Sequence, residues 1–415
     1  MAALGAVIGS LAAASCVSAA SAATWTVQPA PAPSGAPDAA LAAVSCPSST
    51  SCMAVGSSDF GFDRLAINLV GPIATFAERW DGASWTVLPT PSVVGSPALL
   101  SVSCASPTFC VAVGSTQTGG RQYLAGLTGA ARNARALLEM WDGTGWAVRA
   151  TPLSSVRGGR LTGVSCVSSN FCMAVGSTGL VWNGSSWRQV KLPAVRYHAT
   201  LTAVSCVAAG DCTAVGSRDA DKTGVAYLLP LAAHWRAGRW TVSRPPGERD
   251  VYHGKPYVND TWLTSVSCPS RAWCLATGQT LRTQNFYPQG GFADVWNGRR
   301  WTAAATGLAR NSPLNGVGCV APGDCFAAGQ YDPRTITSPA TQQPLLMHWT
   351  GRAWSRESVP RTATLTNRVW NAGNLLDPDL FGVGCVLRTG CSAVGAQPAG
   401  ARSAPLAMST LPGPG

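Results

Sequence analysis

One block of sequence returns seven times along this chain, and it constrains the fold more than any other feature. The block reads Leu-x-x-Val-x-Cys-x5-Cys-x-Ala-x-Gly. Its copies begin at Leu41, Leu99, Leu161, Leu201, Leu263, Leu314 and Leu380. A block that recurs along a whole chain is typical of a solenoid or a propeller, in which each repeat is one small unit of secondary structure.

The repeated block accounts for fourteen of the fifteen cysteines, which leaves only Cys16. The pairs are Cys46 with Cys52, Cys104 with Cys110, Cys166 with Cys172, Cys206 with Cys212, Cys268 with Cys274, Cys319 with Cys325, and Cys385 with Cys391. A metal site is the alternative, but structural zinc sites use shorter spacings with further Cys or His nearby. The four histidines, His198, His234, His253 and His348, form no cluster in the sequence. We therefore expect one disulfide per block, no metal and no cofactor.

A second block follows six of the seven copies and consists of two tryptophans that flank a turn. It occurs at Trp80–Trp85, Trp141–Trp146, Trp182–Trp187, Trp235–Trp240, Trp296–Trp301 and Trp349–Trp354. Several copies carry Asp-Gly or Asn-Gly after the first tryptophan, and we expect this dipeptide to supply the positive φ angles that a tight hairpin turn requires.

Two hairpins per repeat give four strands. The shortest repeat, from Cys166 to Cys206, spans 40 residues, which is the size of one propeller blade. The sequence therefore predicts an all-β, seven-bladed β-propeller of four-stranded blades with one disulfide hairpin in each. A β-solenoid is the alternative, and it would need shorter and more uniform coils.

The seventh copy lacks a second hairpin, and the missing strand is found near the other end of the chain. Residues 25–31 (Trp-Thr-Val-Gln-Pro-Ala-Pro) match residues 85–91 (Trp-Thr-Val-Leu-Pro-Thr-Pro) at five of seven places. We expect this N-terminal strand to complete the last blade, which closes the ring and hides two sheet edges. Residues 24–415 then form a single propeller domain.

Residues 1–23 carry no charge, Ala2–Ala14 is an Ala-rich apolar run, and Ser21-Ala22-Ala23 has the small residues of a cleavage site. This pattern predicts a signal peptide over 1–23 and a secreted protein. A membrane anchor and lipid attachment at Cys16 are the alternatives. We see no other membrane-spanning segment, and we expect a monomer.

The chain is basic, with 30 Lys and Arg against 19 Asp and Glu, a net charge of +11. The arginines are spread between Arg64 and Arg402 with no dense run. Nucleic-acid binding usually shows a stripe or cluster of basic residues, so this dispersal argues against it. A preference for anionic surfaces remains open.

The Trp-Asp-Gly-x-x-Trp hairpins at Trp80–Trp85 and Trp141–Trp146 resemble the Asp-box hairpins of bacterial sialidase-like (BNR-repeat) propellers. The motif departs from that family because no residue separates Asp from Gly. The resemblance covers residues 24–415 and implies a secreted propeller. It also implies glycosidase activity, but the arginine trio and the Tyr–Glu pair of sialidases have no assignable counterparts in this sequence.

Ligand binding is expected where the blades differ from one another. The turn inside each repeated block is short, whereas the connections at the opposite ends of the strands are long and unlike: 57–73, 115–135, 244–262, 279–291, 330–343 and 359–379. Loops on a rigid scaffold carry function. Candidate ligand-binding residues are Arg64, Tyr123, Arg249, Tyr252, His253, Tyr257, Tyr287, Tyr331 and Trp370.

These features predict a non-enzymatic binding or scaffold propeller rather than an enzyme. Its expected partner is a carbohydrate, an anionic cell-envelope polymer or an extracellular protein. A glycan-acting hydrolase or lyase is the alternative. A glycosidase usually needs two carboxylates that converge, and the long connections offer Asp59, Asp63, Asp219, Asp221, Glu248, Asp250, Asp260, Asp332, Asp377 and Asp379.

Overall fold

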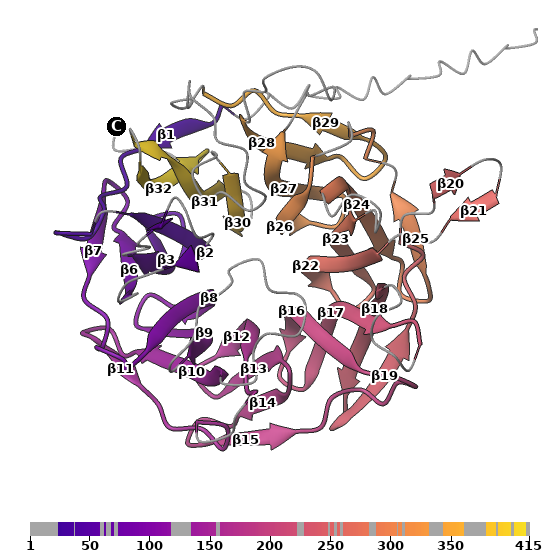
Figure 1. The fold of residues 1–415 in the computed structure, drawn as a ribbon, viewed down its shortest axis with the longest axis horizontal. Helices are drawn as coiled ribbons and strands as arrows, with labels where there is room; N and C mark the ends of the chain where they lie inside the picture. Colours follow the sequence, from indigo (N-terminus) through magenta and orange to yellow (C-terminus); the bar gives the residue numbers. More distant parts are fainter. Residues whose placement is uncertain are drawn as a thin grey trace, which may run out of the picture.

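The structure is a computed structural model of the chain. It describes residues 24–411 apart from 37, 59–61, 64–67, 70–73, 118–133, 155–157, 222–227, 248–249, 253–254, 258–259, 282–287, 305, 309–311, 332–342, 361–378, 387–388 and 400–401. Seven four-stranded antiparallel sheets stand around an axis as the blades of a propeller (Figure 1). The propeller prediction is confirmed, and the solenoid alternative is wrong because each repeat closes its own sheet. No helix in the described part of the chain is long and apolar enough to span a membrane.

The first four blades follow the sequence repeat directly, with the first strand of each nearest the axis (Figure 1). Blade 1 contains β2 (Ala39–Ser48), β3 (Ser51–Ser58), β6 (Ala74–Trp80) and β7 (Trp85–Leu88), and blade 2 contains β8 (Ser96–Ser106), β9 (Phe109–Gln117), β10 (Ala134–Trp141) and β11 (Trp146–Val148). Blade 3 contains β12 (Leu161–Ser168), β13 (Phe171–Gly176), β14 (Gly179–Trp182) and β15 (Trp187–Val190), and blade 4 contains β16 (Ala199–Ala208), β17 (Asp211–Asp219), β18 (Leu228–Arg236) and β19 (Arg239–Ser243).

The remaining blades keep this order except for the last strand of blade 7. Blade 5 contains β22 (Asp260–Ser270), β23 (Trp273–Leu281), β24 (Pro288–Trp296) and β25 (Trp301–Ala304), and blade 6 contains β26 (Leu314–Ala321), β27 (Asp324–Tyr331), β28 (Gln343–Trp349) and β29 (Trp354–Arg356). Blade 7 contains β30 (Asp379–Val386), β31 (Gly390–Ala399), β32 (Arg402–Ser409) and β1 (Thr26–Gln28).

The N-terminal strand closes the ring as predicted. Strand β1 pairs antiparallel with β32, with Thr26 opposite Ser409 and Val27 opposite Met408. Figure 1 shows the indigo β1 beside the yellow β32. Trp25, which is 2% exposed, lies with its ring centroid 5.5 Å from that of Phe326 in blade 6. The closing strand therefore also fastens the last blade to its neighbour.

The repeated Leu and Gly are explained by a β-bulge that every inner strand carries. In blade 3 the bulge lies between Leu161 and Gly163, and Leu161 is fully buried. Gly176 on the second strand faces it, and a Cβ there would lie 2.0 Å from the carbonyl oxygen of Arg160. The corresponding distances in the seven blades run from 1.8 to 2.5 Å. Only glycine leaves room for the bulge at this position.

Inner strands are joined by side chains that bond the backbone of the next blade. The Ser165 hydroxyl accepts a hydrogen bond from the Cys206 amide at 3.0 Å, and the serine before the first cysteine makes the same contact from blades 1, 2, 4 and 5. The Thr162 hydroxyl donates to the carbonyl of Leu201 at 2.8 Å, and the equivalent threonines of blades 4 and 5 do likewise. We call the seven inner strands with these contacts the hub.

All seven predicted disulfides are present, each within one blade. They join Cys46 to Cys52, Cys104 to Cys110, Cys166 to Cys172, Cys206 to Cys212, Cys268 to Cys274, Cys319 to Cys325, and Cys385 to Cys391. Their Cα–Cα distances lie between 3.9 and 4.1 Å because each pair bridges adjacent strands of a hairpin. The second cysteine of every pair is completely or almost completely buried. These fourteen cysteines therefore belong to the scaffold of the blades.

The tryptophan hairpins lie beside the disulfide turns. In blade 1, Trp80 pairs opposite Trp85, and the Trp80 indole donates to the carbonyl of Ser49 in the disulfide turn at 3.3 Å. A Cβ at Gly82 would meet Thr50 of that same turn. The disulfide turns and the tryptophan turns thus share one end of the blades, which we call the short-turn face.

The Asp-Gly and Asn-Gly turns differ in one respect from expectation. In blade 1 only Gly82 has a positive φ, of 100°. Asp81 instead accepts hydrogen bonds at Oδ1 from the amides of Ala83 and Ser84, both at 2.9 Å. The dipeptide therefore supplies one positive φ angle, at the glycine, while the aspartate accepts the amide hydrogen bonds of the turn.

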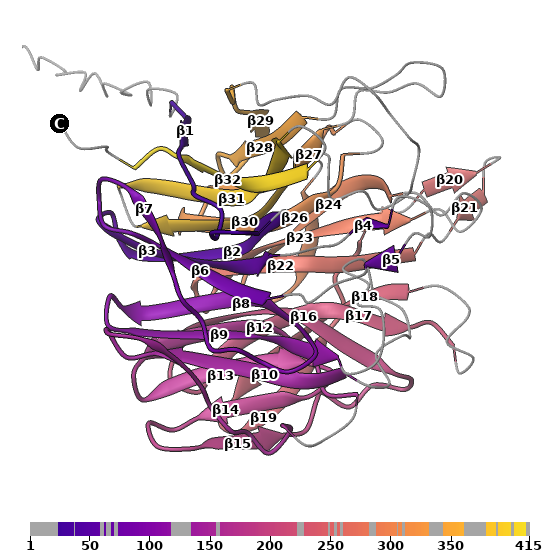
Figure 2. The ribbon, with the colours of Figure 1, turned by 60° about the vertical axis from the view of Figure 1, so that its left-hand side comes forward.

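The opposite ends of the blades carry the longer connections, and we call them the long-loop face. Two small hairpins occur there, β4 (Phe62–Asp63) with β5 (Asn68–Leu69) and β20 (Asp250–Tyr252) with β21 (Lys255–Tyr257). Figure 2 shows both at the same end of the blades, with β20 and β21 standing away from the ring. The long-loop face, on which the sequence analysis predicts the ligand, is therefore less regular than the short-turn face.

Candidate functional site

The candidate ligand-binding residues fall unevenly on the described structure. Tyr331 is fully described, and Tyr252 and Tyr257 are described only as strand residues of the hairpin β20–β21, where they lie opposite Lys255 and Asp250. The others, Arg64, Tyr123, Arg249, His253, Tyr287 and Trp370, lie outside the described residues.

Tyr331 ends β27 on the long-loop face and is half-buried. The guanidinium of Arg356, at the end of β29, lies 3.7 Å from the centre of its ring. A guanidinium over an aromatic face is attracted by the ring's π electrons, so the two side chains hold each other in place. They present a positive charge and a phenol together at the edge of blade 6.

A chain of amide and carboxylate groups joins blades 5, 6 and 7 toward the axis. The Gln279 side-chain amide donates to Asn315 Oδ1 at 2.6 Å. Asn315 in turn donates from Nδ2 to Asp379 Oδ1 and to the carbonyl of Leu380, both at 2.9 Å. All three side chains are half-buried, so they form a preorganised polar group near the long-loop ends of the inner strands.

Two aspartates on the long-loop face accept hydrogen bonds from the backbone of a neighbouring blade. Asp260 accepts the Leu228 amide of blade 4 at 2.6 Å, and burial raises its pKa. Asp38 makes the equivalent bond to the Ser403 amide of blade 7 at 2.7 Å. Each lies three residues before the repeated leucine. Asp260, one of the candidate catalytic acids, is therefore engaged in holding two blades together.

Three acids inside the blades were not singled out from the sequence. Glu78, Glu139 and Asp294 are fully buried and lie two residues before the first tryptophan of their hairpins. Burial raises the pKa of Glu78 to about 8 and those of Glu139 and Asp294 to about 7. The signal that could have found them is an acid at an apolar repeat position, which the other copies fill with Leu180, Ala233, Met347 and Met408.

These three acids have few partners. Glu139 accepts from the Thr75 hydroxyl of blade 1 at 3.5 Å, and Asp294 accepts from the Gly247 amide at 3.1 Å. Neither carboxylate oxygen of Glu78 has a hydrogen-bond partner among the described residues. Their enclosure makes them elements of the interior of the ring.

The two histidines that precede hairpin tryptophans are packed into blade interfaces. His234 lies between the Thr213 hydroxyl, 3.0 Å from Nδ1, and the Ser243 hydroxyl, 3.1 Å from Nε2, and burial lowers its pKa to about 4. His348 stacks on Phe326 at 4.4 Å, and its Nε2 lies 2.7 Å from Asp324 Oδ1. Both imidazole rings therefore make packing and hydrogen-bond contacts within the scaffold.

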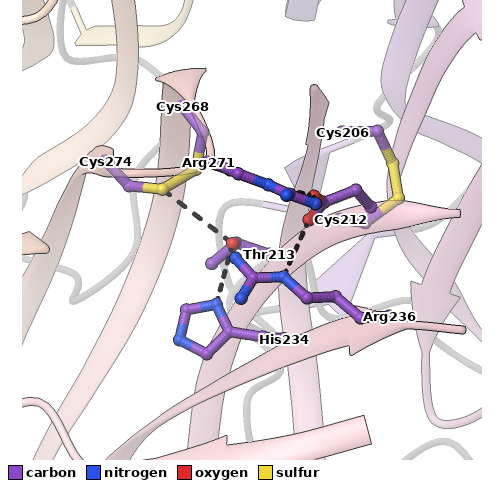
Figure 3. A network of polar contacts seen from close by, with 9 residues as sticks. Cys206, Cys212, Thr213, His234, Arg236, Cys268, Arg271 and Cys274 are labelled. Atoms are coloured by element: carbon purple, nitrogen blue, oxygen red, sulfur yellow. Dashed lines mark hydrogen bonds and ion pairs between the residues drawn. A yellow bond between two sulfur atoms is a disulfide. The ribbon is translucent and has the colours of Figure 1, made fainter. Parts of the chain in front are cut away.

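One ion-pair network lies on the short-turn face, between blades 4 and 5. Asp211 binds the Arg236 Nε through Oδ1 at 3.1 Å and the Arg271 Nε through Oδ2 at 2.9 Å, and Arg271 Nη2 approaches the same oxygen (Figure 3). The side chain of Asp211 is 10% exposed, whereas those of Arg236 and Arg271 are 46% and 67% exposed. The sequence did not reveal this network because its members are up to 60 residues apart.

Within the described ranges, no group of three or more His, Cys, Asp or Glu side chains is placed to hold a metal ion. The cysteines of the described residues are joined in disulfides, Asp260 bonds to a backbone amide, and Asp211 bonds to two arginines.

Comparisons with known proteins identify the fold and no family. No family model matches the chain, and no curated protein matches it. It is similar to the structure of YCF48 bound to D1 peptide, with 10% identity over 94% of this chain and 97% of that one and a TM-score of 0.51. YCF48 from Cyanidioschyzon merolae is similar at 11% identity, covering 94% and 98%, with a TM-score of 0.52. An ancestral GH74 enzyme aligns at 12% identity over 89% of this chain and 46% of that chain, with a TM-score of 0.49.

At these identities the likeness shows the fold alone. The resemblance of the tryptophan turns to Asp-box propellers stays a prediction from the sequence motif.

Proposed function

We propose that this protein is a non-enzymatic binding or scaffold propeller whose ligand lies on the long-loop face. The observation that carries the proposal is how the two ends of the blades use their side chains. At the short-turn face and the hub, the repeated Leu, Ser, Cys, Gly and Trp are buried or bonded within the scaffold. At the long-loop face the connections differ from blade to blade, which is where a rigid scaffold displays binding residues.

The chemistry of the described long-loop residues suits a glycan. Tyr331 offers an aromatic face with the Arg356 guanidinium beside it. Gln279, Asn315 and Asp379 offer amide and carboxylate groups whose positions are fixed by their mutual hydrogen bonds. A sugar presents hydroxyl groups that both donate and accept, together with apolar ring faces, so aromatic and amide groups on one surface match it.

A peptide or an extracellular protein is the other partner that this surface could take. A YCF48 structure of the same fold holds D1 peptide. This supports a propeller of this kind as a protein-binding ring, and it adds to the sequence-based expectation of an extracellular partner.

The test is a glycan and cell-wall polymer array probed with residues 24–415, run beside turnover assays on every ligand that binds. We expect binding without turnover, and we expect Tyr331→Ala and Gln279→Ala each to weaken it by about tenfold, the loss of one good contact. Thr144→Ala, on an exposed turn of the short-turn face, is the control and should leave binding unchanged. Product release would replace this proposal with the glycan-acting enzyme. Equal losses in the control would place the ligand elsewhere.

A further inference from the structure

The described turns of the short-turn face differ sharply in charge from blade to blade. In blades 4 and 5 they hold the exposed residues Arg236, Arg239, Arg271, Arg299 and Arg300, which we call the arginine patch, against one acid, Asp211. The turns of blades 1 and 2 hold no arginine and one acid each, Asp81 and Asp142. These two pairs of blades lie on opposite sides of the ring (Figure 1).

Backbone register brings the arginine patch together. Arg236 lies opposite Arg239 across the turn of blade 4, and a hydrogen bond joins Asn297 to Arg300 across the turn of blade 5. A Cβ at Gly298 would touch Ala272, so the Arg299–Arg300 turn lies against the turn that carries Arg271. Arg271 itself reaches Asp211 of blade 4 (Figure 3). The patch is therefore one continuous surface across the interface of the two blades.

The patch holds more positive charge than its acid neutralises. Asp211 binds Arg236 and Arg271. Within the described residues, Arg239, Arg299 and Arg300 have no acidic partner, and all three are exposed. Like charges held side by side on a rigid surface raise the local potential and attract anions.

Asp211 also shows which anion these side chains suit. Its carboxylate takes one guanidinium through each oxygen, and Arg271 approaches with both Nε and Nη2 (Figure 3). The planar fork of a guanidinium matches a carboxylate in this way, whereas a lysine ammonium does not. With only three lysines in the whole chain, its positive charge is almost entirely of the kind that recognises planar anions.

We propose that the arginine patch is a docking surface for a polysaccharide that carries carboxylate groups. A polymer fits better than a single ion because the charges are spread over separate turns on two blades. Trp240 and Trp273 lie half-buried next to Arg239 and close to Arg271 in the sequence, and their indoles offer flat apolar surface that sugar rings can cover. The arginine patch lies on the short-turn face, and the site proposed above lies on the long-loop face. The two sites are therefore independent of each other.

The test measures binding of residues 24–415 to polygalacturonate at low ionic strength by biolayer interferometry. Poly-L-glutamate, double-stranded DNA and neutral dextran serve as the other ligands. The variant R239Q/R299Q/R300Q removes three patch charges and spares the arginines bonded to Asp211. Its control, R149Q/R196Q/R244Q, removes three exposed charges that lie outside the patch. Equal melting temperatures show that all proteins fold alike.

We expect polygalacturonate to bind most tightly, with an affinity that falls as salt is added. The patch variant should weaken it by about 10- to 100-fold, the usual range for losing several exposed charge contacts, and the control by less than about threefold. Tighter binding of poly-L-glutamate or DNA would overturn the proposal, as would equal losses in the two variants or no binding at low salt. Glycan binding by the Tyr331→Ala and Gln279→Ala variants is measured separately. A negative result for the arginine patch would therefore not contradict the proposed function.

Discussion

The hub and the outer joints of this ring are built in different ways. At the hub, most blades meet the next through the same atoms, a serine hydroxyl on a cysteine amide and a threonine hydroxyl on a leucine carbonyl. Farther from the axis, the contacts between blades differ from one interface to another. Blades 6 and 7 meet through Trp25 and Phe326, and blades 4 and 5 meet through Asp211 and its arginines. Blade 1 contains the buried carboxyl group of Glu78. Repetition thus forms the ring, and deviations from the repeat give each joint its own chemistry.

The hub should be the least tolerant region. Gly176→Ala places a Cβ 2.0 Å from the Arg160 carbonyl, a backbone atom that cannot move without undoing the bulge. We expect a loss of more than about 4 kcal/mol in the free energy of unfolding, or no folded protein. Gly145→Ala is the matched control, because a Cβ there meets nothing within 4 Å. Urea denaturation measures both, and similar losses would contradict a special role for the hub.

At the closing joint, Trp25→Ala should cost about 3 kcal/mol, the usual effect of truncating a buried tryptophan. Trp25 is 2% exposed and packs on Phe326, whereas Val27 on the same strand is 40% exposed. Val27→Ala should change the melting temperature little. If the two substitutions have equal effects, the closing strand is not anchored through its tryptophan.

Blade 1 offers a test by pH. The folded pKa of Glu78, about 8, exceeds its ordinary value of 4.5, so the folded state holds this proton more tightly than the unfolded state does. Its contribution to stability is complete below about pH 4.5 and is lost as the pH rises toward 8. Glu139 and Asp294 act in the same direction up to about pH 7. His234, with its pKa lowered to about 4, opposes them below pH 6.5, where the unfolded state gains a proton that the folded state refuses.

Three acids outweigh one histidine above about pH 4.5, so we expect the contribution of these four groups to stability to be highest near pH 4 to 4.5 and to fall by about 2 kcal/mol or more by pH 8, at roughly 1.4 kcal/mol per unit of pKa shift. Glu78→Met, which copies Met347 and Met408 at the same position, should reduce this slope and stabilise the protein at pH 8. Glu78→Gln should reduce the slope without the stabilisation, because it keeps a buried polar group without a partner. Melting curves from pH 5 to 8 decide between these outcomes.

Removing a single disulfide should have a moderate and local effect. Replacing Cys166 and Cys172 by alanine opens a short loop, worth about 2 kcal/mol in the chain-entropy model. Peptide mapping without reduction should recover the other six links within their own blades. Free thiols or links between blades in the native protein would contradict the structure.

The smallest effect is expected at the joint of blades 4 and 5. Arg271→Gln breaks an ion pair whose arginine is 67% exposed, so the loss should stay below about 1 kcal/mol and shrink further in high salt. Arg299→Gln, which breaks no ion pair among the described residues, should leave stability unchanged. A large effect of Arg271→Gln would show that this pair supports the ring more than its exposure implies.

Much of the fold could be predicted from the sequence because the repeat carries it. The spacing of Cys166 and Cys172 indicated the disulfide, the length of one repeat indicated the blade, and Trp25 indicated the closure. The bulge that explains Gly176 could not be predicted, since a bulge changes the register without changing the pattern of residues.

The candidate surfaces were less predictable. Tyr331 was singled out as an aromatic in a long connection, but its partner Arg356 lies on another strand, and only the folded blade brings them together. The arginine patch was hidden because its members occur singly or in pairs along the chain, and only the stacking of consecutive blades makes them neighbours. The buried acids were visible as departures from an apolar position, a signal that needs the copies to be aligned column by column.

The pairing of β1 with β32 has a consequence for engineering. Because Thr26 and Ser409 are direct partners in one sheet, a short linker can join the two ends without disturbing either strand. New ends can then be opened in a surface connection between two other blades, which yields a circularly permuted ring. Such a permutant keeps every inter-blade contact and exchanges the non-covalent fastening of blade 7 for a covalent one. It would allow a reporter or a second domain to be attached at any chosen point of the circumference.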